Sequence, residues 1–366
     1  MGAFMPYSII PPQLFSVEDY EKSAAKVIDH IAWSYLVGGS GDELTLEWNK
    51  QAFQRIQLQG RVLNNFEGAN TKLTLLGNTL PFPILLAPVA WQKLFHKDGE
   101  LATMQAASAI GAGMVVSTMA STLLEELAEQ ATKPLWFQLY IQADRTFTAE
   151  LVKRAELAGY KALVLTVDAP ISGVRNREQR VNFRLPQGVS SVNLEGMHVV
   201  NNTANLLESP LFSGQLASVP TWQDIEWLQS ITSLPILLKG VTSVADAEQA
   251  IQLGVNGLII SNHGGRVLDT LPAAIELLPR IAEHVAGRVP ILMDGGIRRG
   301  TDILKALALG ANAVLVGRPY IYALAVAGAV GVVHLINILR AELEAAMVLT
   351  GCRTLADINP SVIWQS

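Results

Sequence analysis

The sequence predicts an α/β fold, a closed TIM (β/α)8 barrel of parallel strands. Short apolar runs recur at 83–87, 113–118, 135–141, 162–168, 235–239, 257–262, 290–294 and 313–316. Continuous apolar runs are typical of parallel strands that are buried on both faces. Amphipathic stretches of helical period fall between them, at 99–110, 123–130, 146–158, 245–253, 273–285 and 302–309. Eight such units favour a closed barrel over an open doubly wound sheet, which usually has about five or six strands.

Two segments fall outside this repeat. Residues 1–80 precede the first strand, and we expect helices there, followed by a short strand pair that covers the barrel base. Residues 171–220 carry Gly, Pro, Asn and Ser with little periodicity, and a connection of that length is often a functional lid. Because no linker or low-complexity tract interrupts the chain, we expect residues 1–366 to form a single domain.

Composition and charge narrow the classes of function. Half of the residues are apolar and the net charge is −5, which argues against nucleic acid as a partner and gives no reason to expect an anionic membrane surface. The single cysteine, Cys352, excludes an intramolecular disulfide and a cysteine-based metal site, so we expect no metal. Residues 1–24 lack the basic start and the unbroken apolar stretch of a signal peptide. We therefore expect a cytoplasmic protein.

One segment, 320–339, is apolar and long enough to span a bilayer. It is interrupted by Gly328, Gly331, His334 and Asn337, and an arginine-proline pair comes directly before it. These interruptions favour a buried barrel helix, so we expect no membrane partner.

Polar side chains and glycines follow the predicted strands. The active site of a (β/α)8 barrel lies at the carboxyl ends of its strands. Polar side chains near a core are costly unless they are paired, so a barrel built only for stability has no reason to hold them there. In chain order, these ends carry Pro88-Val89-Ala90, Ser117, Gln138 with Tyr140, Thr166 with Asp168, Lys239, the run 261–266, the run 294–296, and Gly317-Arg318.

The last two units predict a phosphate site. The run from Asp294 to Gly300 opens one helix, and Gly317-Arg318 opens the next. Backbone N–H groups at a helix N-terminus and a nearby arginine bind anions, and barrel phosphate sites commonly follow strands seven and eight. A sugar phosphate and a phosphorylated flavin fit this pattern equally well.

His263 and Arg266 indicate an acid–base site. A histidine beside an arginine suits removal of a proton from a substrate whose carboxylate the arginine holds. Asp168 is placed to pair with this histidine and stabilise its charged form. An isolated histidine is more often structural, and we expect that of His30, His96, His198, His284 and His334.

Four motifs resemble the FMN-dependent 2-hydroxy acid oxidase family, which includes glycolate oxidase and L-lactate oxidase. They are Ser-Asn-His-Gly-Gly-Arg at 261–266, Leu-Pro-Ile-Leu-Leu-Lys-Gly at 234–240, Asp-Gly-Gly-Ile-Arg-Arg-Gly at 294–300 and Phe-Gln-Leu-Tyr at 137–140. The resemblance runs from about residue 15 to 355 and weakens only in the 176–220 loop. It implies FMN as the cofactor, a small L-2-hydroxy acid and O2 as partners, and a homotetramer.

The resemblance also implies how the cofactor is held. Lys239 would lie near the pyrimidine edge of the flavin, where a fixed cation stabilises the reduced form, and Ser261 would face the cofactor. The residues that would line the flavin ring are Pro88, Val89, Ala90, Ser117, Gln138 and Thr166. Those that would hold the ribityl chain and phosphate are Asp294, Gly296, Arg298, Gly317 and Arg318.

For the substrate, the resemblance implies a carboxylate held by Arg266, Arg175 and the hydroxyl of Tyr35. Tyr140 would hydrogen-bond the substrate oxygen, and His263 would be the base, with Asp168 supporting its protonated state. Removal of the α-proton and removal of the hydroxyl proton both stay open. Apart from the resemblance, Tyr35 fits an ordinary aromatic residue at a helix end, and Arg175 and Arg177 fit solvated loop charges.

Two departures from the glycolate oxidase pattern bear on the substrate. Met119 stands where those enzymes carry a tryptophan that faces the substrate, and Val89 replaces a threonine in the flavin-contacting tripeptide. A methionine leaves more room than a tryptophan and adapts its shape. We therefore expect L-lactate to be preferred and glycolate to react as well.

The electron acceptor is expected to be O2, with H2O2 as product, because 176–220 shows no apolar or basic anchoring insert and no haem-binding domain precedes residue 80. The alternatives are an FMN-dependent L-lactate dehydrogenase and a lactate mono-oxygenase. Two further hypotheses are a barrel aldolase that forms a Schiff base on Lys239, which leaves Tyr140 and His263 unexplained, and a flavin-binding protein without turnover.

Overall fold

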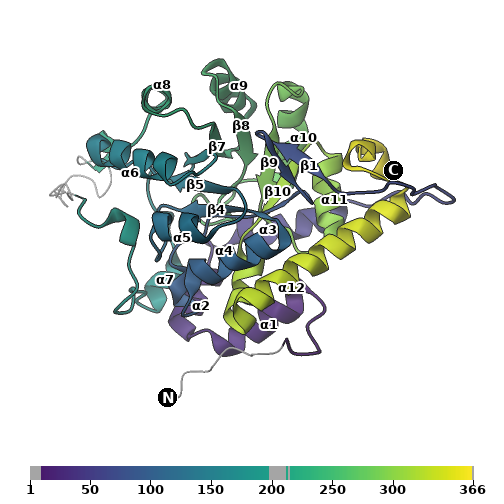
Figure 1. The fold of residues 1–366 in the computed structure, drawn as a ribbon, viewed down its shortest axis with the longest axis horizontal. Helices are drawn as coiled ribbons and strands as arrows, with labels where there is room; N and C mark the ends of the chain where they lie inside the picture. The colour runs from purple at the N-terminus through teal and green to yellow at the C-terminus, as the bar shows by residue number, and fades with distance from the viewer. Residues whose placement is uncertain (1–9, 198–211, 213–214, 365–366) are drawn as a thin grey trace.

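The computed structural model describes residues 10–197, 212 and 215–364. Eight parallel strands close into a barrel in the order β10-β3-β4-β5-β6-β7-β8-β9 (Figure 1), which confirms the predicted fold class. Every strand except β7 lies within its predicted range, and β7 runs on to Val241. The strands are β3 (Ile84–Leu86), β4 (Gly113–Ser117), β5 (Leu135–Leu139), β6 (Leu163–Thr166), β7 (Ile236–Val241), β8 (Gly257–Ile260), β9 (Ile291–Asp294) and β10 (Ala313–Val316).

Both faces of the strands are buried, because successive side chains point to opposite sides of the barrel wall. Leu85, Val115, Val164, Leu237 and Ile259 belong to a cluster inside the barrel. Their neighbours along the strands pack outward against the helices. This two-sided burial explains why the strands are continuous apolar runs in the sequence.

Helices surround the barrel, and the six predicted amphipathic stretches begin and end within two residues of the observed helices, whereas the helix predicted at 320–339 extends from 318 to 350. Asp144 and Ser243 cap the helices α6 and α9, where their side-chain oxygens accept a hydrogen bond from the first turn. The sequence analysis singled out no helix at α8. The helices are α4 (Gly99–Ile110), α5 (Leu124–Gln130), α6 (Arg145–Leu157), α8 (Gln223–Ile231), α9 (Val244–Gln252), α10 (Ala274–Val285), α11 (Gly300–Ala308) and α12 (Arg318–Thr350).

The apolar segment that passes a length test for a membrane span lies in α12. Within the described part of the chain, α12 is the candidate found, and 67% of its most apolar window is buried. The helix packs against α1, α4 and α11 (Figure 1). It changes direction at Ala327 and Gly328, whose backbone angles are not helical. Helix α12 is therefore buried as a core helix of the barrel is.

The N-terminal extension contacts both ends of the barrel. The strands β1 (Leu73–Leu75) and β2 (Asn78–Leu80) pair antiparallel, and their Leu75 and Leu80 side chains join the interior cluster at the base. The preceding helices are α1 (Val17–Val27), α2 (His30–Val37) and α3 (Leu44–Arg55). Of these, α2 and α3 reach the opposite end, where Asn49 of α3 hydrogen-bonds Asn262 beyond β8. The extension therefore supplies part of the wall around the carboxyl ends of the strands.

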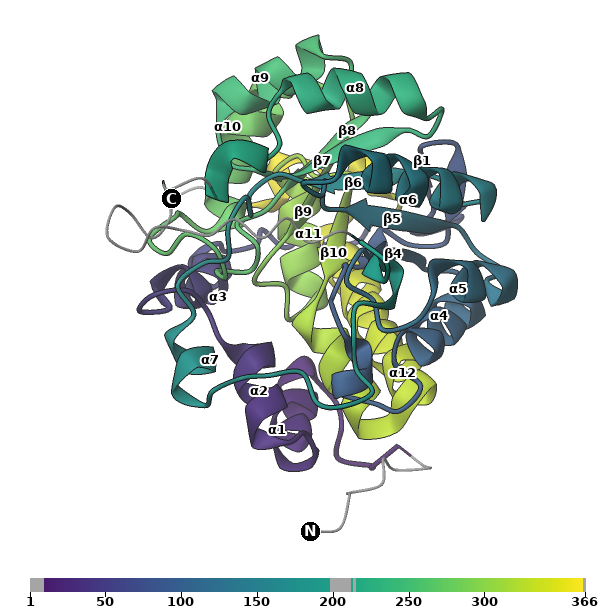
Figure 2. The same cartoon turned by 90° about the vertical axis from the view of Figure 1, so that its left-hand side faces the viewer.

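The long connection after β6 is partly helical. It contains the short helix α7 (Asn176–Arg180) and the 3-10 turns η2 (Val192–Leu194) and η3 (Gln215–Ser218). Helix α7 lies beside α2 (Figure 2). Asn193 of η2 is buried and joins this connection to the loop before α5, since it hydrogen-bonds Leu124 N and Thr122 O. The parts of the predicted lid at 198–211 and 213–214 lie outside the described residues.

Candidate active site

A cavity of about 1060 Å³ opens at the carboxyl ends of the strands. Its size is at the upper end of the usual range for small-molecule and cofactor sites. Asp168 and Ser261 do not line it but hydrogen-bond residues that do. The predicted site residues that line it are Tyr35, Pro88, Val89, Ala90, Ser117, Met119, Gln138, Tyr140, Thr166, Arg175, Lys239, His263, Arg266, Asp294, Gly296, Arg298, Gly317 and Arg318.

Lys239 of β7 and Asp294 of β9 line the floor of the cavity, and Ser261, directly after β8, hydrogen-bonds both without lining the cavity; we call these three residues the floor. Lys239 Nζ lies 3.0 Å from Ser261 Oγ and 3.2 Å from Asp294 Oδ2, and the Ser261 hydroxyl donates to Asp294 Oδ1. Burial lowers the pKa of Lys239, but the carboxylates of Asp294 and Asp168 outweigh it and raise the net pKa. Lys239 therefore stays protonated and paired with Asp294, whereas a Schiff-base lysine needs a lowered pKa.

A second polar row crosses β4, β5 and β6. Gln138 Nε2 donates to Thr166 Oγ1 at 3.0 Å, and the Ser117 hydroxyl lies 3.3 Å from Gln138 Oε1. The three side chains are buried and come from neighbouring strands. Ser117 and Gln138 are partners in the strand register, and Thr166 lies two residues beyond Val164, the partner of Gln138, on the same face of β6. The three side chains therefore present fixed hydrogen-bonding groups along one wall of the cavity.

His263 and Asp168 form a buried pair, with His263 Nδ1 2.9 Å from Asp168 Oδ1. Burial lowers the pKa of His263, and Asp168 only partly opposes this. Burial alone would raise the pKa of Asp168, but the charges of His263 and Lys239 outweigh it and the net pKa is lowered. An ionised Asp168 only accepts hydrogen bonds, so Nδ1 carries the proton and Nε2 keeps its lone pair. The pair is thus arranged as a base.

Backbone geometry holds this pair in place. His263 has a positive φ of 56°, which is uncommon outside glycine and here aims its ring at the cavity. Gly240 has a φ of 108° at an irregularity in β7, and a Cβ there would lie 2.5 Å from the Cβ of Asp168. Asp168 approaches β7 closely because position 240 has no side chain.

The candidate substrate end is built from three segments far apart in the sequence. The Arg266 guanidinium lies over the Tyr35 ring, 4.8 Å from its centroid, and donates to Tyr35 O and Gly38 O at 2.7 Å. Arg266 and Arg175 both donate to Oε1 of Glu178, at 3.1 and 3.3 Å. We call Arg175 and Arg266 the clamp.

Glu178 was not among the predicted site residues. A signal for it exists in the spacing of Arg175 and Glu178, because side chains three residues apart on a helix lie on one face. Asn49 was not predicted either; its buried side chain exchanges two hydrogen bonds of 2.9 Å with Asn262. No local pattern predicts that contact.

The predicted phosphate end lies where α11 and α12 begin. Gly296 has a φ of 83°, and a Cβ there would lie 2.1 Å from Asn49 O, so the turn packs directly on α3. Arg298 lines the cavity. The Arg318 guanidinium also lines it, but donates to the carbonyl oxygens of Leu36, Gly264 and Gly38 at 2.8 to 2.9 Å. Arg318 therefore braces α2 against the loop after β8 as well as adding positive charge.

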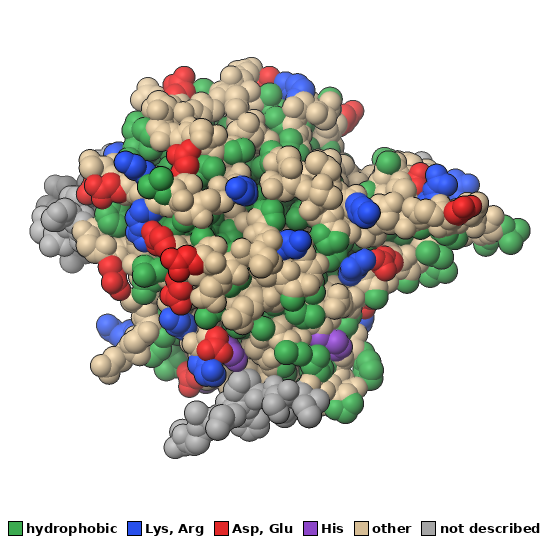
Figure 3. Space-filling view, in the orientation of Figure 1, with side chains coloured by type: hydrophobic (Ala, Val, Ile, Leu, Met, Phe, Trp, Pro, Cys, Tyr) green, Lys and Arg blue, Asp and Glu red, His purple; other side chains and the backbone are tan. Residues whose placement is uncertain are grey.

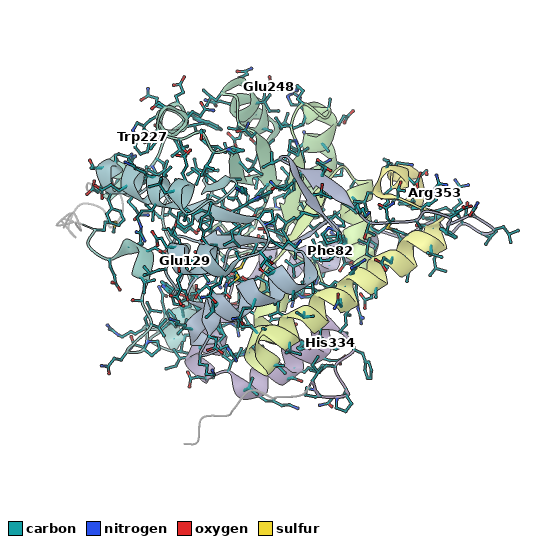
Figure 4. All side chains as sticks on the ribbon, in the orientation of Figure 1. Phe82, Glu129, Trp227, Glu248, His334 and Arg353 are labelled. Carbon is teal, nitrogen blue, oxygen red and sulfur yellow. The ribbon has the colours of Figure 1, made fainter. Side chains whose placement is uncertain are left out.

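Three other histidines have structural contacts. His96 Nδ1 accepts a hydrogen bond from Asp98 N at 3.2 Å. His334 on α12 bonds the Tyr20 hydroxyl at 2.9 Å, and His284 pairs with Glu248 at the surface; Figure 4 labels His334 and Glu248. His198 lies outside the described residues. On the face drawn in Figure 3, basic and acidic side chains are interspersed. Within the described ranges, no group of three or more His, Cys, Asp or Glu side chains is placed to hold a metal ion.

Comparison with known proteins identifies the family. The model of the FMN-dependent dehydrogenase family matches residues 24–365. The chain belongs to this family. It is 47% identical over 352 residues to an L-lactate oxidase of Nostoc sp., covering 94% of this chain and 96% of that protein. It is 43% identical to glycolate oxidase 3 of Arabidopsis thaliana, covering 95% of each chain.

A solved structure of mandelate oxidase with benzoyl-formic acid has a TM-score of 0.88 and 38% identity to this family member, covering 97% of this chain and 99% of that one. The prediction of an FMN-dependent oxidoreductase on a TIM barrel is therefore confirmed.

The cavity fits FMN, the cofactor of the family. The glycine turn 295–296 and the start of α12 leave backbone next to the cavity, with Arg298 beside them, as a phosphate requires. Lys239 supplies the buried positive charge that suits a flavin which gains negative charge on reduction. The residues present are those that FMN needs.

Proposed function

We propose that this protein oxidises small L-2-hydroxy acids to 2-oxo acids, with L-lactate preferred, glycolate also accepted and O2 reduced to H2O2. The observation that carries the proposal is one cavity lined by both a neutral His263 and the two arginines of the clamp. A base and a carboxylate site in one cavity are the two parts that oxidation of a 2-hydroxy acid needs. The relatives named L-lactate oxidase and glycolate oxidase support the substrate class.

In this proposal the substrate carboxylate binds to Arg266 and Arg175, with the Tyr35 hydroxyl as a third donor. Burial raises the pKa of Tyr35, so its hydroxyl keeps its proton at neutral pH. Hydrogen bonds from arginine to a carboxylate are charge-assisted and fix its orientation. Holding the carboxylate places the hydroxyl-bearing carbon beside His263.

His263 Nε2 then takes a proton from the substrate, and the ionised Asp168 stabilises the imidazolium that forms. Burial raises the pKa of Tyr140 to about 12, so the Tyr140 hydroxyl can donate a hydrogen bond to the substrate oxygen. FMN supplies the acceptor for the two electrons that leave the substrate. Lys239 would hold the pyrimidine edge of FMN, and Arg298 and Arg318 would bind its phosphate. Ser261 does not line the cavity and would act on the cofactor through Lys239.

The preference for L-lactate depends on Met119, which lines the cavity. Its flexible side chain leaves room for the methyl group of lactate, and one methyl group is worth about 1–3 kcal/mol in an apolar pocket. The test is kcat/KM for L-lactate and glycolate in air, with H2O2 and the 2-oxo acid measured together. A larger value for L-lactate supports the proposal, and a larger value for glycolate contradicts the preference.

The products distinguish the acceptor hypotheses. An oxidase forms one H2O2 per pyruvate, whereas a lactate mono-oxygenase forms acetate and CO2 without free peroxide. A dehydrogenase turns over with an artificial electron acceptor and consumes little O2. Stoichiometric peroxide and pyruvate would support the oxidase.

Location and assembly belong to the same proposal. We place the protein in the cytoplasm, and its one thiol, the buried Cys352, is compatible with that location. We also propose that it is a homotetramer, because of its family. Cell fractionation and size-exclusion chromatography with light scattering test the two statements. A monomer in solution or a membrane-bound fraction would contradict them.

A further inference from the structure

Glu178 lies behind the clamp. Its Oε1 accepts hydrogen bonds from both clamp arginines, and its side chain is only 15% exposed. Glu178 is not among the residues that line the cavity, whereas Arg175 and Arg266 are. The carboxylate therefore contacts the two guanidinium groups from outside and leaves the space in front of them to the substrate.

The neighbouring arginine of α7 is already paired with a carboxylate. Arg177, next to Glu178, pairs with Glu43 through its Nε at 2.9 Å. The clamp thus has two guanidinium charges and one carboxylate charge, which leave one positive charge. That charge matches the single carboxylate of a 2-hydroxy monocarboxylic acid.

A second carboxylate on the substrate would need a second cation. Of the other cations that line the cavity, Arg318 gives its donors to three carbonyl oxygens, and Lys239 is held by Ser261 and Asp294 on the floor. The cavity lining also includes Met119, Ile171 and Trp222, which are apolar. A buried charge without a partner is costly, so a dicarboxylic acid would be disfavoured at this end.

We propose that Glu178 sets the charge selectivity of the clamp: it cancels one arginine charge, so that the site selects monocarboxylates and discriminates against dicarboxylates. The inference rests on the proposed function, in which the clamp binds the substrate carboxylate. Glu178 acts through the arginines and is a positioning and specificity residue, not a catalytic one.

Coulomb's law predicts how removal of the Glu178 charge changes the binding of anions. The repulsion between Glu178 and a bound anion scales with the charge of that anion, so its removal favours a dianion more than a monoanion. The substitution Glu178→Gln removes the charge and keeps the shape and an acceptor oxygen for the arginines. A merely structural role would change the affinity for both ligands by the same factor.

The experiment uses the FMN-loaded protein and two non-oxidisable three-carbon acids, propionate and malonate. Isothermal titration calorimetry measures the Kd of each. For Glu178→Gln we expect propionate to bind about threefold more tightly and malonate about tenfold or more, so that the ratio of the two Kd values shifts at least threefold. Glu178→Asp keeps the charge and should keep the wild-type ratio. Glu248→Gln removes a surface carboxylate that pairs with Arg288 and should also leave the ratio unchanged.

An unchanged ratio of the two Kd values in Glu178→Gln, or equally weaker binding of both acids, would overturn the inference. Glu178 would then only hold the two arginines in place. Glu178→Ala provides the same test should the glutamine variant fail to fold, since it must shift the ratio in the same direction. Failure of propionate to bind the wild type would contradict the proposed function itself. Binding of propionate with an unchanged ratio would contradict only the role of Glu178.

Discussion

The floor of the cavity and the clamp are built from different parts of the chain. Lys239, Ser261 and Asp294 lie at the ends of three neighbouring strands, so the barrel itself fixes their positions. Arg266 and Arg175 come from loops and meet through Tyr35 of α2 and Glu178 of α7.

This difference suggests that the barrel strands position the catalytic groups and that the loops position the groups that bind the substrate. The floor also fixes the base, because His263 N donates to Ser261 Oγ at 3.0 Å. Substitutions of His263 and its partner Asp168 should therefore change the rate of the chemical step, and substitutions in the clamp should change substrate binding. Three substitutions test this division, and a fourth tests the tether between α3 and the loop after β8.

The largest effect is expected for His263→Asn. Asparagine tolerates the positive φ at this position but cannot act as the base. We expect kcat to fall by about 10²–10⁴, the usual contribution of a general base, with FMN retained. Anaerobic stopped-flow reduction by L-lactate measures the rate. His284→Asn, at the surface, is the control, and near-normal reduction in His263→Asn would remove the histidine from its role.

Arg266→Lys should act mainly on KM. Lysine keeps the positive charge but loses the forked donors and the stacking on Tyr35. We expect KM for L-lactate to rise about 10–100-fold, with a smaller change in kcat. Arg177→Lys, in the pair with Glu43, should leave KM unchanged. A fall in kcat with constant KM would contradict the division between floor and clamp.

Asp168→Asn should shift the acid limb of the pH profile. Burial holds the pKa of His263 below its ordinary value, and Asp168 opposes that shift. Without this carboxylate the pKa of His263 falls further, so the neutral base persists to lower pH. We expect the acid limb of kcat/KM to move down by about one pH unit, and kcat to fall because the imidazolium loses its partner. An acid limb that stays in place or moves to higher pH would refute the pairing.

The smallest effect is expected for Asn49→Ala, which removes the tether between α3 and the loop after β8. Asn262 would lose its two hydrogen bonds to Asn49, and the buried Ala274 N–H would lose its acceptor. An unsatisfied buried polar group costs about 1–3 kcal/mol, so urea unfolding should show a loss of that size. Asn64→Ala, at an exposed site, serves as the comparison. Equal midpoints for the two variants would mean that this tether does not stabilise the protein.

The same comparison explains what the sequence could predict. Strand positions follow from continuous apolar runs, and the rule that barrel sites lie at the carboxyl ends of strands then locates Lys239 and Asp294. Tyr35 and Arg175 were identified only through the family resemblance. The pairing of Asn49 with Asn262 spans 213 positions, and the partners of Glu178 depend on where two loops fold. Such contacts arise from tertiary packing, which local patterns do not encode.

The central claim is that one cavity joins an FMN site to a base and a carboxylate clamp that act on an L-2-hydroxy acid. An anaerobic visible spectrum of the purified protein before and after L-lactate tests it most directly. The account predicts a flavin spectrum that bleaches with L-lactate and returns when air is admitted, with formation of H2O2. A yellow protein whose spectrum does not change on addition of L-lactate or glycolate would contradict it.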